Sequence, residues 1–117
     1  MEFRVTFDDQ GVPKGGTAIE RLFCFWRKVC DHPQAKLDPK RQKLIGRALA
    51  PPPQGLGYPE DQLLQAIWGC ANSPFHRGRN ENHREYTSLD LILRDASHID
   101  SMIHLTKPAL AAQRSRF

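Results

Sequence analysis

Apolar residues recur at helical spacing in three stretches of this chain, and a proline ends or follows each stretch. In residues 17–30 they lie at the i, i+3, i+4, i+7 positions that give a helix one buried face. Thr17 and Glu20 have the spacing of a capping box, in which each side chain bonds a free backbone N–H at the helix start. Pro33 disfavours helical geometry in the residue before it, so the helix should end nearby. The first stretch therefore predicts an amphipathic helix.

Two further helices are predicted by the same reasoning. Residues 39–50 follow Asp38, which is a good N-cap, and begin with a proline at the first helical position. Residues 58–72 carry acidic residues in the first turn, where they favour the positive end of the helix dipole. Capping signals at Thr87 and Ser97 predict two more, shorter helices.

These elements predict an all-α fold, a compact bundle of about five helices with a long loop between the third and the fourth. Residues 1–16 alternate like a strand at first but then contain Gly and Pro, so we expect an extended or disordered arm without a partner strand. The helical domain spans residues 17–105. Residues 106–117 are expected to form a loose basic tail.

Composition limits the classes to which the protein can belong. A hydrophobic share of 39% supports one modest core. No apolar run approaches the roughly 20 residues that span a bilayer, and the N-terminus does not resemble a signal peptide, so we expect a cytoplasmic protein without membrane contact. Cys24, Cys30 and Cys70 lack metal-site spacing and are expected to be reduced, buried thiols; a zinc site with His76 or His83 is the alternative.

Positive charge suggests nucleic-acid binding. The candidate phosphate contacts lie in and before the second helix and in the loop after the third. Phe75 and Tyr86 in that loop are candidates for base stacking, with anchoring of the loop to the core as the alternative. For the cations, plain solvation is the alternative. The candidate DNA-binding residues are Lys36, Lys40, Lys43, Arg47, Arg77, Arg79 and Arg84.

Arg41 differs from its basic neighbours because it falls within the apolar arc of the second helix. It is therefore expected to be structural and to pair with a carboxylate at the edge of the core. Asp95 is the candidate partner.

No catalytic motif for a hydrolase or nucleotidase occurs in the sequence. His32, His76, Asn80 and His83 could form a nuclease-like set, but the surrounding sequence lacks the strand and helix that would orient a metal site. We therefore expect a protein that is not an enzyme and has no metal or cofactor.

Five motifs in order resemble a known family. They are Trp26, HPQAKLDPKRQKLIGRAL, GYPEDQLLQAIWGCANSPFHRGRN with its G-x-N loop, and YTSLDLILRDASHID. Together they resemble the C-terminal domain of phage and prophage replication proteins, initiators or helicase loaders broadly of the DnaD type. The positions that match the pattern are Lys36, Lys40, Arg41, Gly57, Tyr58, Ser73, Pro74, His76, Gly78, Asn80, Leu91, Arg94 and Asp95.

This resemblance implies a non-enzymatic phage replication accessory module in the cytoplasm of a bacterial host. Such a module would bind single-stranded DNA and a replisome protein, above all the replicative helicase. The alternative is a small phage protein that modulates a host complex without contacting DNA. Phe25 and Trp68 add apolar surface that permits a homo-oligomer.

Overall fold

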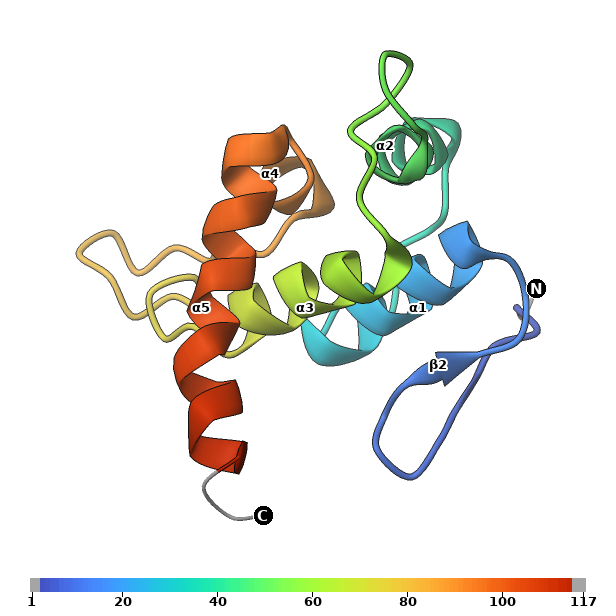
Figure 1. The fold of residues 1–117 in the computed structure, drawn as a ribbon. Helices are drawn as coiled ribbons and strands as arrows, with labels where there is room; N and C mark the ends of the chain where they lie inside the picture. The colour runs from blue at the N-terminus through green and yellow to red at the C-terminus, as the bar shows by residue number, and fades with distance from the viewer. Residues whose placement is uncertain (1–2, 115–117) are drawn as a thin grey trace.

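A computed structural model describes the backbone of residues 3–114 and the side chains of residues 3–105. It has the expected all-α architecture, with five helices and one very small sheet (Figure 1). Helix α5 crosses one end of α3, and α1 runs beside α3 (Figure 1). The elements are β1 Thr6–Phe7, β2 Pro13–Lys14, α1 Ala18–Val29, α2 Pro39–Leu49, α3 Glu60–Ala71, α4 Leu89–Ile92 and α5 Ala96–Arg114.

The N-terminal segment corrects the expectation of an unpaired arm. Strands β1 and β2 pair with each other as an antiparallel hairpin. The Asp8 carboxylate shapes the turn by accepting hydrogen bonds from the backbone N–H groups of Gln10 and Val12, both at 2.9 Å. The Phe3 ring meets the ring of Phe23 edge-on at 5.8 Å, which attaches the hairpin to α1. The sequence shows the first strand, whereas the second contains a proline and is too short to predict.

The predicted starts of α1 and α2 are confirmed. Thr17 Oγ1 accepts from the Glu20 N–H at 3.1 Å, and the Glu20 carboxylate accepts from the Thr17 N–H at 2.8 Å. Asp38 accepts from the Arg41 N–H at 2.8 Å. These side chains satisfy backbone donors that have no partner inside the helix, and so they fix where each helix begins.

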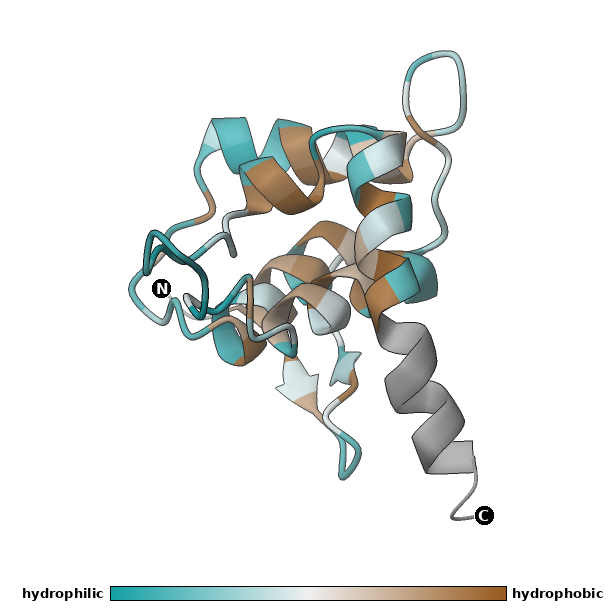
Figure 2. Cartoon of the chain, turned by 90° about the vertical axis from the view of Figure 1, so that its left-hand side faces the viewer, coloured by the Kyte–Doolittle hydropathy of each residue, from teal (hydrophilic) through white to brown (hydrophobic). Residues whose placement is uncertain are grey.

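One core joins all five helices. Trp26 and Phe23 of α1 are its largest fully buried side chains. Figure 2 shows the apolar segments of the helices turned toward one another, while the loops are largely hydrophilic. Phe25, which lies off the predicted stripe, is also buried, whereas Trp68 is 40% exposed. The fully buried core also includes Leu22, Cys30, Ile45, Leu63, Ile67, Cys70, Ile92, Leu93 and Ile99.

The last two helices begin one or two residues away from the predicted positions. Ser88, not Thr87, caps α4 by accepting from the Leu91 N–H at 3.2 Å. Asp95 caps α5 by accepting from the His98 N–H at 2.9 Å. Helix α5 continues to Arg114. The predicted basic tail, residues 106–117, otherwise lies outside the described side chains.

Candidate nucleic-acid interface

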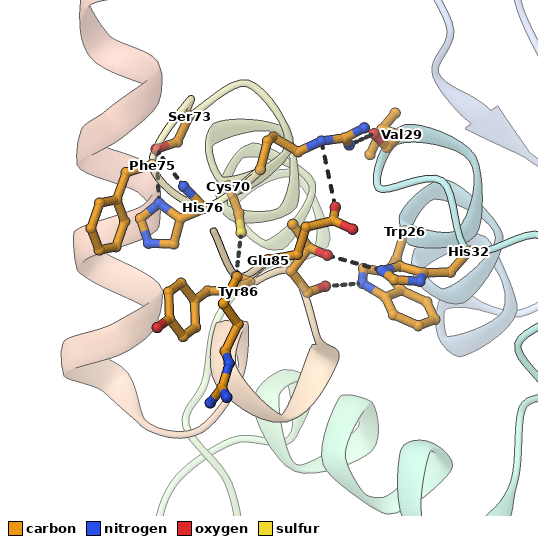
Figure 3. Close-up of polar contacts among 12 residues, drawn as sticks. Trp26, Val29, His32, Cys70, Ser73, Phe75, His76, Glu85 and Tyr86 are labelled. Carbon is orange, nitrogen blue, oxygen red and sulfur yellow. Dashed lines mark hydrogen bonds and ion pairs between the residues drawn. The ribbon is translucent and has the colours of Figure 1, made fainter. Parts of the chain in front are cut away.

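The chain between α3 and α4 is attached to α1 by a buried polar network (Figure 3). The Trp26 indole N–H donates to the backbone carbonyl of Thr87 at 2.7 Å. The Thr87 hydroxyl lies 2.9 Å from Nε2 of His32, whose ring stacks on Trp26 at 4.7 Å. Thr87 is the buried polar side chain among the described residues. The hydrogen bonds of Thr87 with Trp26 and His32 fix the point at which the loop enters α4.

Two further contacts hold the same loop to the ends of α1 and α3. The Cys70 thiol donates to the Tyr86 carbonyl at 3.2 Å. The Arg77 guanidinium donates to the carbonyl of Val29, the last residue of α1, at 3.0 Å, and lies 3.8 Å from the Glu85 carboxylate (Figure 3). A cation at this position also complements the negative end of the helix dipole. Arg77 is therefore directed into the protein and not toward a phosphate.

Asn80 organises the outer part of the loop. Its side-chain amide donates to the carbonyls of Phe75 at 2.8 Å and Arg84 at 2.7 Å. Its carbonyl oxygen accepts from the N–H groups of Asn82 at 3.0 Å and Arg84 at 3.2 Å. One side chain thus satisfies four backbone groups, which gives this glycine-containing loop a defined shape.

The loop presents a pair of stacked rings at the surface. The rings of Phe75 and Tyr86 lie 5.7 Å apart at an interplanar angle of 17° (Figure 3). Phe75 is 54% exposed, and Tyr86 is half-buried. The backbone of Tyr86 is anchored to Cys70, while the Phe75 ring remains accessible, so base stacking on this pair stays a prediction.

A groove of about 320 Å³ lies beside the ring pair. Its other walls come from Leu91 of α4 and from His98 and Met102 of α5. Leu91 is one of the positions that match the family pattern, whereas His98 and Met102 were not predicted as site residues. The sequence pattern that could have indicated this groove is the i, i+4 spacing of His98 and Met102, which places both side chains on one side of α5.

His76 lies at the inner edge of this groove. Its Nδ1 is 2.8 Å from the Ser73 hydroxyl. Burial lowers the pKa of His76, because the charged ring is less well solvated there. The ring is thus held by Ser73 while it lines the groove.

The remaining loop cations behave differently from Arg77. Arg79 and Arg84 are exposed, and within residues 3–105 their side chains have no acidic partner. The loop projects from the side of the molecule opposite the β1–β2 hairpin (Figure 1). Its two accessible cations and the ring pair therefore lie on one protruding segment.

The basic stripe on α2 is partly used within the fold. Lys40 lies 3.4 Å from the Asp90 carboxylate of α4. Arg47 donates to the carbonyls of Leu93, at 3.2 Å, and of Arg94, so it closes the end of α4. Lys36 and Lys43 are exposed and, among the described side chains, are bonded to no acid.

The seven predicted DNA contacts thus fall into two groups that do not form one patch, one on and before α2 and one on the loop (Figure 1). Within each group, the structure directs some cations into the fold and leaves others accessible.

The predicted ion pair between Arg41 and Asp95 is wrong. Arg41 lies 3.9 Å from Asp38, donates to the Lys36 carbonyl at 2.7 Å, and places its guanidinium 5.3 Å from the Trp26 ring centroid. Asp95 instead bonds His98 through its ring at 2.8 Å and through its backbone N–H. Arg41 is structural, as expected, but its carboxylate is the cap of its own helix.

The nuclease-like set does not converge. His32 bonds Thr87, His76 bonds Ser73, and Asn80 bonds the loop backbone. In the described part of the chain, no group of three or more His, Cys, Asp or Glu side chains is placed to hold a metal ion. The three cysteines are buried thiols, which agrees with their predicted structural role.

Comparison of this chain with protein-family models, with curated proteins and with solved structures finds no match. The resemblance to replication proteins therefore remains a prediction from the sequence motifs. Within the described residues, no helix combines the length and apolar character needed to cross a membrane. The fold and the surface define a small helical domain with an anchored loop that carries exposed rings and cations.

Proposed function

We propose that this protein is a non-enzymatic accessory module of phage DNA replication that binds single-stranded DNA and a replisome protein. The observation that carries the DNA-binding part is the exposed Phe75 ring, stacked on Tyr86, on a loop that also carries Arg79 and Arg84. The assignment to replication rests on the sequence motifs and supplies the helicase as the expected protein partner.

The chemistry of the loop favours a single strand over a duplex. Unpaired bases expose their faces and can stack on the accessible face of Phe75, which contributes roughly 1–3 kcal/mol per base. The guanidinium groups of Arg79 and Arg84 can pair with the phosphates that flank a stacked base. Since Asn80 and the contacts of Thr87 fix the loop before binding, little conformational entropy is lost when a strand docks.

Fluorescence anisotropy of a labelled single-stranded oligonucleotide, measured across a salt series, tests the DNA-binding part. Each cation that pairs with a phosphate adds about 0.7 to the slope of log affinity against log salt for a single strand. Arg84→Gln should lower that slope by about this amount, and Phe75→Ala should weaken binding with little change in slope. Arg94→Gln removes the same charge from an exposed position outside the loop and should have no such effect.

A second function, binding of a host protein without DNA contact, is supported by a different surface. A groove of about 1000 Å³ lies between the hairpin turn and helices α1 and α3. Trp68 and Phe25 line it with rings 6.5 Å apart, and Asp8 and Asp9 form its acidic edge. This combination fits a protein segment that presents an apolar side chain beside a cation.

Pull-down from host lysate with the wild type and with Trp68→Ala separates the two functions by the identity of the captured partner. Capture of the replicative helicase or primase that depends on Trp68 would support the replication role. Capture of an unrelated host complex, together with no DNA binding by the wild type, would support the second function.

A further inference from the structure

A pocket of about 270 Å³ lies where the hairpin meets the end of α1. It is separate from the loop and from the α2 stripe. Apolar side chains form most of its wall, and two adjacent cations, Arg27 and Lys28, complete it. Among the residues that the structure describes, no acidic side chain lines it. The full lining is Phe3, Val5, Phe7, Cys24, Arg27, Lys28 and Pro33.

Arg27 has unused hydrogen-bonding capacity. Within residues 3–105, its half-buried guanidinium makes one long hydrogen bond, 3.4 Å to the Ala35 carbonyl, and lies 5.6 and 5.2 Å from the ring centroids of Phe3 and Phe23. A guanidinium has five N–H donors. In the described part of the chain, no carboxylate pairs with this one.

Arg21, also half-buried on α1, shows how a guanidinium in this protein uses most of its donors. It binds the Glu60 carboxylate through two nitrogens, both at 2.8 Å. It also donates to the carbonyls of Gly15 at 3.0 Å and Gly16 at 2.9 Å. Compared with Arg21, the Arg27 guanidinium is held mainly by the Phe3 and Phe23 rings and keeps N–H donors available at the pocket.

Lys28 adds a second charge without an internal acceptor. Its ammonium lies 4.1 Å from the centroid of the Phe7 ring and, among the described residues, pairs with no carboxylate. Two successive cations that pair with no carboxylate of residues 3–105 match the charge of a phosphate monoester, about −1.5 to −2, better than that of a single carboxylate. The apolar wall of Phe3, Phe7 and Pro33 suits a flat ring attached to that phosphate.

We propose that this pocket binds one nucleotide, with the phosphate on Arg27 and Lys28 and the base against the hairpin rings. Its volume of about 270 Å³ lies just below the roughly 300–1,000 Å³ of small-molecule sites, so it limits the ligand to a single nucleotide. A free mononucleotide and the phosphorylated end of a strand present the same chemistry. Both are therefore candidates for the ligand.

Isothermal titration calorimetry with thymidine 5′-monophosphate tests the proposal. The nucleotide should bind, whereas thymidine and inorganic phosphate should each bind at least about tenfold more weakly, since each lacks one half of the contact. Arg27→Gln should weaken nucleotide binding by about tenfold or more. Arg94→Gln, which removes the same charge far along the chain, should leave it within about twofold.

Lys28→Gln is the second variant, because Lys28 is exposed and its loss should not disturb folding. Far-UV circular dichroism and thermal unfolding check that each variant is folded. Absence of nucleotide binding by the wild type, or unchanged binding by both folded variants, would overturn the proposal. Oligothymidylate with and without a 5′-phosphate separates the sources: tighter binding of only the phosphorylated strand identifies a strand end.

Failure of this proposal is distinguishable from failure of the DNA-binding function. Arg84→Gln changes the loop and should leave mononucleotide binding unaltered. Single-stranded DNA binding without mononucleotide binding would reject the pocket alone. Mononucleotide binding without single-stranded DNA binding would reject the loop alone.

Discussion

Replacing Thr87 by valine removes one hydroxyl group while almost conserving the volume of the side chain. Thr87 is 2% exposed, and its hydroxyl is the polar partner of His32 at 2.9 Å. An unsatisfied buried group costs about 1–3 kcal/mol, but His32 is only half-buried, so water can replace part of the bond. We therefore expect the free energy of unfolding to fall by about 1–1.5 kcal/mol.

Urea unfolding followed by tryptophan fluorescence measures this change, since Trp26 stacks on His32. Thr6→Val is the matched control, because Thr6 is exposed on β1, and it should change the free energy of unfolding by less than about 0.5 kcal/mol. In a double-mutant cycle with His32→Phe, the coupling should be about 1 kcal/mol. A loss below about 0.3 kcal/mol for Thr87→Val, or no coupling, would refute the role of this bond.

Three other predictions concern the loop, the α2 stripe and the thiols. Asn80→Ala should leave global stability nearly unchanged but speed amide hydrogen exchange of the loop, as measured by NMR, because four local hydrogen bonds are lost. Arg47→Gln should lower the thermal midpoint by several degrees, about 1 kcal/mol, whereas Lys43→Gln should not; equal effects in thermal scans would contradict the different contacts of these two cations. Burial raises the pKa of Cys30 and of Cys70 from 9.0 to about 12, so the folded state holds these protons more tightly than the unfolded chain does. The contribution of the two thiols to the free energy of unfolding, measured in urea, should therefore stay constant below about pH 9 and decrease as the pH rises above it.

The sequence was a good guide to the helices because their signals are local. Capping pairs and apolar periodicity depend on residues within one or two turns, and so Thr17 and Asp38 were found at the correct helix starts. The hairpin was not predicted because its second strand has only two residues. Its position also depends on the packing of Phe3 against Phe23 of α1, a contact between residues distant in sequence. Thr87 was misread as a cap because its burial under Trp26 depends on contacts distant in sequence.

The candidate site was harder to predict than the fold, because exposed cations and structural cations look alike in a sequence. Arg77 and Arg79 are two residues apart, yet one binds the end of α1 and the other is exposed. The partner of Arg41 was also misassigned, since Asp38 satisfies it locally. For Arg77 and Arg79, tertiary contacts decide which charge remains for a ligand, and those contacts have no local signature in the sequence.

Salt-dependent binding of single-stranded DNA tests whether the loop cations pair with phosphates. The double variant Arg79→Gln, Arg84→Gln should lower the slope of log affinity against log salt by about 1.4, twice the single-cation effect. Lys14→Gln combined with Arg94→Gln is the control for the same loss of charge from exposed positions outside the loop, and it should change the slope far less. An unchanged slope in the loop variant, or no binding by the wild type at low salt, would contradict the account.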